Sequence, residues 1–333
     1  MITFTLCLLT LIAGYFIYGH FIERVFGPDD RKTPALTKAD GVDYMPLPTW
    51  KIFMIQFLNI AGVGPIFGAI MGAMFGTASY LWIVFGSIFA GAVHDYLGGM
   101  LSLRHGGESL PEIIGRYLGL PTKQVMRGFT VILMMLVGAV FVASPAGLLA
   151  KLTPGALDNT FWIIVIFVYY IMATLLPVDK IIGKVYPLFA IALIFMAVGI
   201  LVMLYVYHPA LPEIWDGLQN THPKAASNPI FPMMFITIAC GAISGFHATQ
   251  SPLMARCMTS ERYGRPIFYG AMITEGIVAL IWATVATYFF HKEGMGITDA
   301  SIVVFDISKG WLGTFGGVLA ILGVVAAPIT SGD

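Results

Sequence analysis

Two carboxylates lie in apolar surroundings, where an ionised group is energetically costly. Of the 18 acidic residues in the 333-residue chain, Asp95 and Glu275 are the two that sit well inside long apolar blocks. A charge at the centre of a bilayer costs about 2.5–3.5 kcal/mol, so each carboxylate requires a partner or a wet cavity. Because a carboxyl group in apolar surroundings can exchange a proton near neutral pH, Asp95 is the first candidate for a coupling proton, with His94 and Glu275 behind it. The alternative for both carboxylates is a structural ion pair or a capped hydrogen bond.

Two histidines extend this chemistry. His94 adjoins Asp95, but neighbours on a helix point about 100° apart, so the two side chains need not face one site. His247 lies in a polar stretch of another apolar block. It is a candidate donor to a substrate carboxylate, or else a cap for backbone carbonyls that a helix break sets free.

Glycine, proline and polar side chains interrupt two of the apolar blocks. One reads Gln56-Phe-Leu-Asn-Ile-Ala-Gly-Val-Gly-Pro-Ile-Phe-Gly68, and the other reads Ile238-Ala-Cys-Gly-Ala-Ile-Ser-Gly-Phe-His-Ala-Thr-Gln-Ser-Pro252. Proline removes a backbone N–H and glycine adds backbone freedom, so Gly-Val-Gly-Pro65 predicts a weakened or broken helix. Unpaired backbone at membrane depth is tolerated only inside the protein or along a cavity, and a matched pair of such spans points to a transporter site. Ordinary close packing of helices through small residues is the alternative.

The elements that must position these residues are transmembrane helices. Hydrophobic residues make up 58% of the chain and charged residues 11%, whereas soluble domains carry about 25% charged residues. The apolar blocks are 17 to 26 residues long, enough to cross a bilayer core of about 30 Å as helices. We expect an all-α polytopic membrane protein with nine spans, at 2–22, 52–75, 80–103, 128–150, 160–176, 186–207, 230–255, 267–290 and 311–330.

The composition argues against several other classes. The net charge is zero, so no basic patch points to nucleic acid. Cys7, Cys240 and Cys257 have no metal-type or redox-type spacing, and the sequence holds no motif for a metal or another cofactor. The block at 2–22 lacks the basic region and cleavage site of a signal peptide, so we interpret it as a true first span.

The order of the spans predicts an inverted repeat. The interrupted spans are the second and the seventh, five apart, so they cross the membrane in opposite directions. We expect one transporter domain over 1–333, with an extra helix at 1–22, a first five-helix repeat at 52–207 and a partial second repeat at 230–333. The connections after odd-numbered spans carry 14 Lys and Arg residues and those after even-numbered spans carry 4. This asymmetry puts the N-terminus outside, unless the greater length of the first set of loops is its cause.

Several segments resemble the carbon starvation protein A (CstA) family over almost the whole chain. They are Asp40-Gly-Val-Asp-Tyr-Met-Pro46, Ala61-Gly-Val-Gly-Pro65, Ala90-Gly-Ala-Val-His-Asp95, Ser109-Leu-Pro-Glu-Ile113 and Phe231-Pro-Met-Met-Phe-Ile-Thr-Ile-Ala-Cys-Gly-Ala-Ile-Ser-Gly-Phe-His247. The resemblance implies a bacterial inner-membrane carrier, related in fold to amino-acid transporters, that takes up peptides or pyruvate with protons during carbon starvation. It also indicates the short form of the family, and a C-terminus at which family members run on into further helices.

The resemblance also marks site residues. Long members carry paired histidines where this chain has Ile55 and Gln56, and often a glutamine in place of His94. Gly62, Gly64, Pro65, Asp95, Ser244, Gly245 and His247 match the family pattern. The full candidate pathway for substrate and ion is Gln56, Asn59, Gly62, Gly64, Pro65, His94, Asp95, Ser244, Gly245, His247, Thr249, Gln250 and Glu275.

We therefore expect a proton-coupled secondary transporter of small carboxylate nutrients in the lipid bilayer, rather than an enzyme. Two alternatives stay open. A membrane sensor of starvation would carry a signalling domain, and an intramembrane enzyme would carry a positioned nucleophile or a metal triad. The sequence offers neither feature.

Overall fold

Every regular element that the structure describes is a helix. The computed structural model describes residues 1–62, 64–153, 155, 157–175, 179–242, 247–294 and 299–332. Elements labelled η are short π-helical or 3₁₀ segments. The elements are α1 (Ile2–Phe16), α2 (Tyr18–Phe26), α3 (Pro34–Thr37), α4 (Thr49–Ile60), η1 (Gly64–Gly68), α5 (Ala69–Ala73), α6 (Ala78–Phe85), η2 (Gly86–Gly91), α7 (Ala92–Arg104), α8 (Leu110–Leu152), α9 (Asn159–Leu175), α10 (Asp179–Tyr207), η3 (Ile214–Asp216), η4 (Ile230–Met234), α11 (Phe235–Ala242), α12 (His247–Ala255), η5 (Glu261–Tyr263), η6 (Arg265–Tyr269), α13 (Gly270–Glu293) and α14 (Ala300–Gly332).

Up to six of the nine expected spans are long and apolar enough to cross a membrane in the described part of the chain. The sixth is the bent pair Thr49–Ile60 and Gly64–Ala73, and three further helices, Asn159–Met172, Ile230–Ala239 and Gly316–Ile329, are apolar but shorter. The all-helical membrane class is therefore confirmed, whereas the number of nine spans stays a prediction. The other five are Ile2–Phe26, Ala78–Arg104, Leu110–Leu152, Phe189–Tyr207 and Glu261–Glu293.

Two helices extend beyond their predicted spans because a glycine turns the chain inside them. α8 begins at Leu110 rather than at 128, and Gly119 has a φ of 84°. α14 begins at Ala300 rather than at 311, and Gly313 has a φ of 70°. Glycine adopts a positive φ without the steric cost that a side chain would add. Each glycine thus separates a first helical piece from the apolar helix that follows it.

The predicted break in the second span is present. α4 ends at Ile60, and the chain resumes at Gly64 with a bend of 51°. The break lies against α14, since a Cβ added at Gly62 would be 3.7 Å from the backbone nitrogen of Pro328. The break predicted for the seventh span falls on 243–246, which lie outside the described residues.

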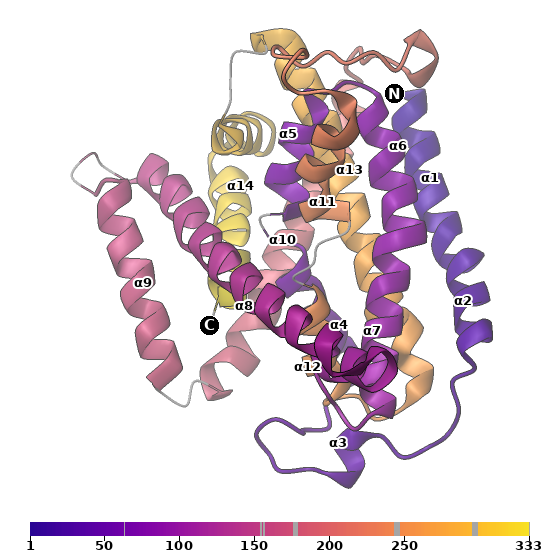
Figure 1. Cartoon of the computed structure of the whole chain (residues 1–333). Coiled ribbons are helices and arrows are strands. Elements are labelled where there is room, and N and C mark those ends of the chain that lie inside the picture. The colour runs from indigo at the N-terminus through magenta and orange to yellow at the C-terminus, as the bar shows by residue number, and fades with distance from the viewer. Residues whose placement is uncertain are drawn as a thin grey trace.

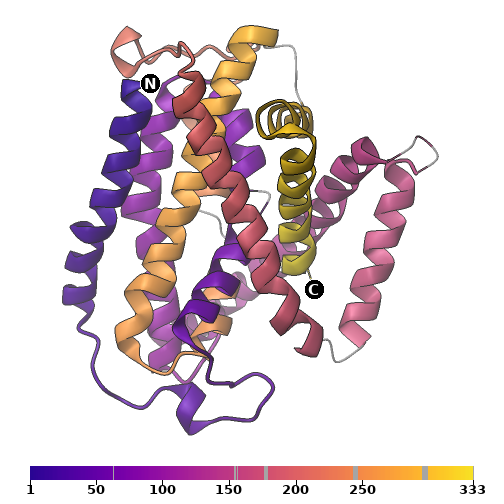
Figure 2. The same ribbon diagram turned by 180° about the vertical axis from the view of Figure 1, so that it is seen from behind.

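The two interrupted spans lie side by side and run in opposite directions. α4 packs on α12, and α5 packs on α11, in opposite halves of the bundle (Figure 1). α13 packs on both α4 and α5 and is buried over most of its length, which agrees with a helix that is apolar on all sides. Seen from behind, α10 crosses the bundle against α4, α13 and α14 (Figure 2).

Segment 208–229 ties the helix ends together on the side of the molecule that holds Met1 (Figure 1). Glu213 of this segment accepts from the Met1 ammonium at 2.5 Å and from the N–H of Thr3 at 2.6 Å. A carboxylate at a helix N-terminus satisfies N–H groups that have no partner within the helix. Glu213 therefore fixes the start of α1.

A buried carboxylate ties the opposite side. Glu261 is fully buried and accepts from Nε and Nη2 of Arg104 at 3.0 and 2.9 Å. It also accepts from the N–H of Asp29 at 3.0 Å. The end of α7, the connection at 27–48 and the turn before α13 are thus joined at one charged group.

Candidate functional site

Four of the ionisable residues that the sequence places inside spans form one continuous chain. Nδ1 of His94 is hydrogen-bonded to Oδ1 of Asp95 at 3.2 Å. Nδ1 of His247 lies 3.1 Å from Oδ2 of Asp95, and its Nε2 lies 3.2 Å from Oε2 of Glu275. We call these four residues the ion chain; it joins α7, α12 and α13.

The ion chain is buried except at one end. The side chains of Asp95, His247 and Glu275 are at most 1% exposed, whereas that of His94 is 38% exposed. The contacts of His247 meet the distance of an ion pair but not the alignment of a hydrogen bond. If His247 is protonated and both carboxylates are ionised, the buried cluster keeps one net negative charge, which is costly away from water. One further proton would make it neutral.

Close helix approaches hold the ion chain in place. A Cβ at Gly99 of α7 would lie 2.4 Å from the ring of Phe268, and one at Gly276 of α13 would lie 2.6 Å from Oγ of Ser87. The hydroxyl of Tyr269 donates to the carbonyl of Ile88 at 3.0 Å, inside the π-helical segment η2. Such segments widen the helix and free backbone groups, and they are frequent at functional sites.

One face of α12 carries three side chains of the site. His247, Gln250 and Ser251 follow the i, i+3, i+4 spacing of one helical face, and all three are buried. Gln250 accepts from Nδ2 of Asn59 at 3.1 Å, and Oγ of Ser251 accepts from Nε2 of Gln56 at 3.3 Å. α12 thus touches the ion chain at its first residue and the broken span along the same face.

A cavity of about 460 Å³ lies at the break of the second span. Asn59, Gly62 and Gly64 line it on the side of the break, and Leu136 and Phe141 of α8 line it opposite. None of the described lining residues is charged. This break cavity suits a small molecule with an apolar body and a polar group beside the interrupted backbone.

Two of the remaining predicted residues, Pro65 and Thr249, lie in the described part of the chain. Pro65 is buried in η1, beside the break. Thr249 is half-buried and faces away from His247, because two residues along a helix rotate by about 200°. Ser244 and Gly245 lie outside the described residues.

Sequence reasoning missed two residues that support the site. Ser251 was not among the candidates, although its distance of four positions from His247 is a signal for the same helical face. Tyr269 was also missed, and nothing in the sequence marks its bond to η2. Ser251 acts by accepting a hydrogen bond from Gln56. Tyr269 acts by donating to η2, the segment before Asp95.

The described residues form no group that could hold a metal ion. The carboxylates of Asp95 and Glu275 approach opposite nitrogens of the His247 ring. The two nitrogens point away from each other, so one ion could not contact the ring and both carboxylates.

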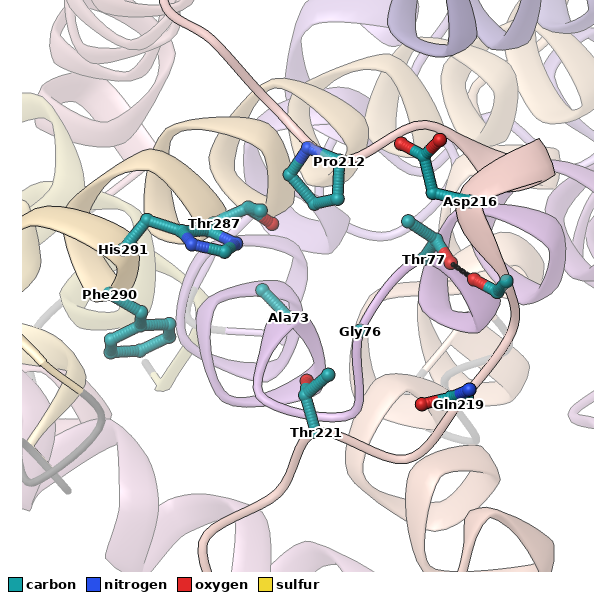
Figure 3. A pocket seen from close by; sticks show the side chains of 11 residues that line it. Ala73, Gly76, Thr77, Pro212, Asp216, Gln219, Thr221, Thr287, Phe290 and His291 are labelled. Atoms are coloured by element: carbon teal, nitrogen blue, oxygen red, sulfur yellow. Dashed lines mark hydrogen bonds between the residues drawn. The ribbon is translucent and has the colours of Figure 1, made fainter.

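A smaller cavity of about 160 Å³ lies under segment 208–229 (Figure 3). Thr77 donates to the carbonyl of Gly217 at 2.6 Å at its edge, while Asp216 and His291 line it on opposite sides (Figure 3). This cavity and the break cavity have no lining residue in common. It is therefore a separate feature of the Met1 side.

Long apolar helices, a broken span and a buried chain of ionisable groups define a multi-pass α-helical membrane protein. The family model of carbon starvation protein CstA matches residues 1–157 and 149–308. The chain belongs to the CstA family, as its motifs indicate.

Relatives of this chain include named transporters. An uncharacterized membrane protein of Haemophilus influenzae is 48% identical over 341 residues, which span 88% of this chain and 92% of its own. The peptide transporter CstA of Bacillus subtilis is 29% identical over 391 residues, 95% of this chain and 65% of its own. The pyruvate/proton symporter BtsT of Escherichia coli is 29% identical over 362 residues, 86% of this chain and 50% of its own. This chain thus spans half to two thirds of the length of these two transporters.

Proposed function

We propose that the protein is a proton-driven secondary transporter of small carboxylate nutrients, of the peptide or pyruvate class, that serves the response to carbon starvation. The observation that carries this proposal is the contact of His247 with both Asp95 and Glu275 inside the bundle. The names of the relatives, peptide transporter and pyruvate/proton symporter, support it.

In this proposal, the coupling proton moves along the ion chain. His94 is its exposed end and Glu275 its buried end. An imidazole can accept a proton at one nitrogen and release one at the other, and His247 has a carboxylate at each. Protonation removes net charge from a dry cluster that joins three helices, so it changes how firmly those helices are held.

In this proposal, the substrate binds in the break cavity. Asn59 lines this cavity and also donates to Gln250 on α12. A substrate that draws Asn59 away from Gln250 would loosen α12 one turn from His247. This is the physical link between substrate binding and the proton site, and such links are reciprocal.

We infer nine spans, arranged as an extra helix at 1–22, a first repeat at 52–207 and a partial second repeat at 230–333. The opposite directions of α4–α5 and α11–α12 support this arrangement. The excess of Lys and Arg in the connections opposite Met1 supports an inner-membrane protein with its N-terminus outside.

Uptake by the full-length protein in liposomes tests the proposal. Labelled pyruvate and labelled dialanine are each offered with a pH gradient, acidic outside, and again after a protonophore has removed it. We expect accumulation of at least one probe with the gradient and only equilibration without it, with protein-free liposomes as the control. If folded protein accumulates neither probe, the proposal is wrong.

A further inference from the structure

A third cavity, more polar than the break cavity, lies between α8 and α14. Its volume is about 530 Å³, and Ser144, Lys151, Asn159, Asp299 and Ser301 contribute polar groups to its lining. We call it the outer cavity, because α8 ends in the half of the molecule that holds Met1 (Figure 1). The break cavity lacks a charged lining among its described residues, whereas the outer cavity has a cation and an anion.

The two cavities meet at one residue. Phe67 lines both of them and lies in η1, directly after the break. From Phe67, the wall of the outer cavity continues along one face of α8 through Ser144, Gly147 and Lys151, which have the spacing of a single helical stripe. Phe67 is therefore part of the wall of both cavities, and Lys151 lies at the other end of the α8 stripe.

An ion pair occupies the outer cavity. Nζ of Lys151 donates to Oδ2 of Asp299 at 2.8 Å and to Oγ of Ser301 at 3.1 Å. The other oxygen of Asp299 accepts from the N–H of Ser301 at 2.9 Å and so caps α14. Burial raises the pKa of Asp299, but the contacts with Lys151 and Ser301 outweigh it and lower the pKa. Lys151 and the start of α14 thus hold Asp299 as an anion, and the Lys151 side chain itself is 30% exposed.

We propose that Lys151 is an outer binding site for the carboxylate of the substrate, and that Asp299 holds this lysine while the site is empty. A carboxylate from solution has the same chemistry as the side chain of Asp299 and can replace it at Nζ, leaving Asp299 bonded to α14. Ser144 and Asn159 offer further hydrogen bonds in the same cavity. This inference rests on the proposed transport function and adds to it the position where the anion is first bound.

Binding and uptake of the same probes test this site separately. In the full-length protein we expect Lys151→Gln to raise the Kd and KM for pyruvate or dialanine about tenfold, the value of a hydrogen bond to a charged group, with kcat little changed. We expect Lys151→Arg to retain the wild-type affinity. Asp299→Asn should increase the affinity, because the Asp299 carboxylate no longer competes with the probe for Lys151. Lys292→Gln is the matched control, since Lys292 is 63% exposed and pairs with its neighbour Glu293.

The charge exchange Lys151→Asp with Asp299→Lys separates binding from a structural tie. It restores an ion pair but places an anion on the α8 wall, so we expect affinity to stay low. Wild-type affinity in this double variant, or in Lys151→Gln, overturns the anion site. If Lys151→Gln shows gradient-driven uptake with an unchanged KM, the transport proposal stands and the proposed anion site is wrong. If binding depends on Lys151 but no probe accumulates, the anion site stands and the transport proposal is wrong. If neither probe binds, both proposals are wrong.

Discussion

Nδ1 of His247 lies 3.1 Å from Oδ2 of Asp95, and this contact joins α12 to α7 in the interior of the bundle. Neither side chain is more than 1% exposed, so water contributes little to either charge. The opposite nitrogen of the same ring faces Glu275. The protonation of one imidazole therefore decides the charge balance of two carboxylates on two different helices.

Replacing either carboxylate should uncouple transport from the proton gradient. Asp95→Asn and Glu275→Gln keep the shape of the side chain but lose the ionisable group. We expect each to reduce gradient-driven accumulation by at least about tenfold, within the range of typical coupling energies, while exchange of labelled for unlabelled substrate continues. The matched control is Glu293→Gln, at the exposed end of α13. Unchanged accumulation in Asp95→Asn would remove Asp95 from the proton route.

Arg104 should matter more for stability than a similar arginine nearby. Arg104→Ala leaves the buried carboxylate of Glu261 without its main partner, which costs about 3–5 kcal/mol when a buried pair is broken. Arg262→Ala breaks a pair with Asp30 in which both side chains are well exposed, so the solvated pair contributes little to stability. Thermal unfolding in detergent measures both variants. Equal losses would show that the Glu261 network is not a buried anchor.

The contact between Glu213 and the start of α1 should be sensitive to acid. Burial raises the pKa of Glu213, but the Met1 ammonium and the N–H groups of Ile2 and Thr3 outweigh it and lower the pKa from 4.5 to about 2. Because the pKa is lower in the folded state, the stabilisation is complete above pH 4.5 and is lost as the pH falls toward 2. The unfolding midpoints of wild type and Glu213→Gln should differ by a constant amount at neutral pH and converge below pH 4.5. A difference that persists undiminished in acid would contradict this assignment.

Adjacent glycines in α7 should respond in opposite ways to alanine. A Cβ at Gly99 would lie 2.4 Å from Phe268, whereas one at Gly98 would meet nothing within 4 Å. Gly99→Ala should destabilise the protein by about 1–3 kcal/mol through overpacking, and Gly98→Ala should stabilise it by about 0.5–1 kcal/mol through helix propensity. Unfolding midpoints of the two variants check this. Similar effects would mean that α7 and η6 are not in tight contact.

Much of the site could be predicted from the sequence because charge is rare at membrane depth. Asp95, Glu275 and His247 stand out for that reason, and the structure brings them into contact. The break before Gly64 was also readable, since glycine and proline act locally. Gln56 and Asn59 were readable as polar residues in an apolar span, although their partners on α12 were not.

Other features depend on tertiary packing and left no local pattern. Lys151 and Asp299 lie in separate connections and look like ordinary surface charges until α8 and α14 meet. The bond from Tyr269 to the carbonyl of Ile88 depends on a π-helical segment that composition does not reveal. The two helices that begin early, α8 and α14, do so because a glycine permits a turn inside an otherwise continuous helix.

Proton influx driven by substrate tests the central claim most directly. Full-length protein is reconstituted into liposomes that enclose a pH-sensitive dye, and pyruvate or dialanine is added outside without a pH gradient. The account predicts acidification of the interior that depends on substrate and is absent in Asp95→Asn and His247→Gln. Substrate uptake by the wild-type protein without any proton influx would contradict it.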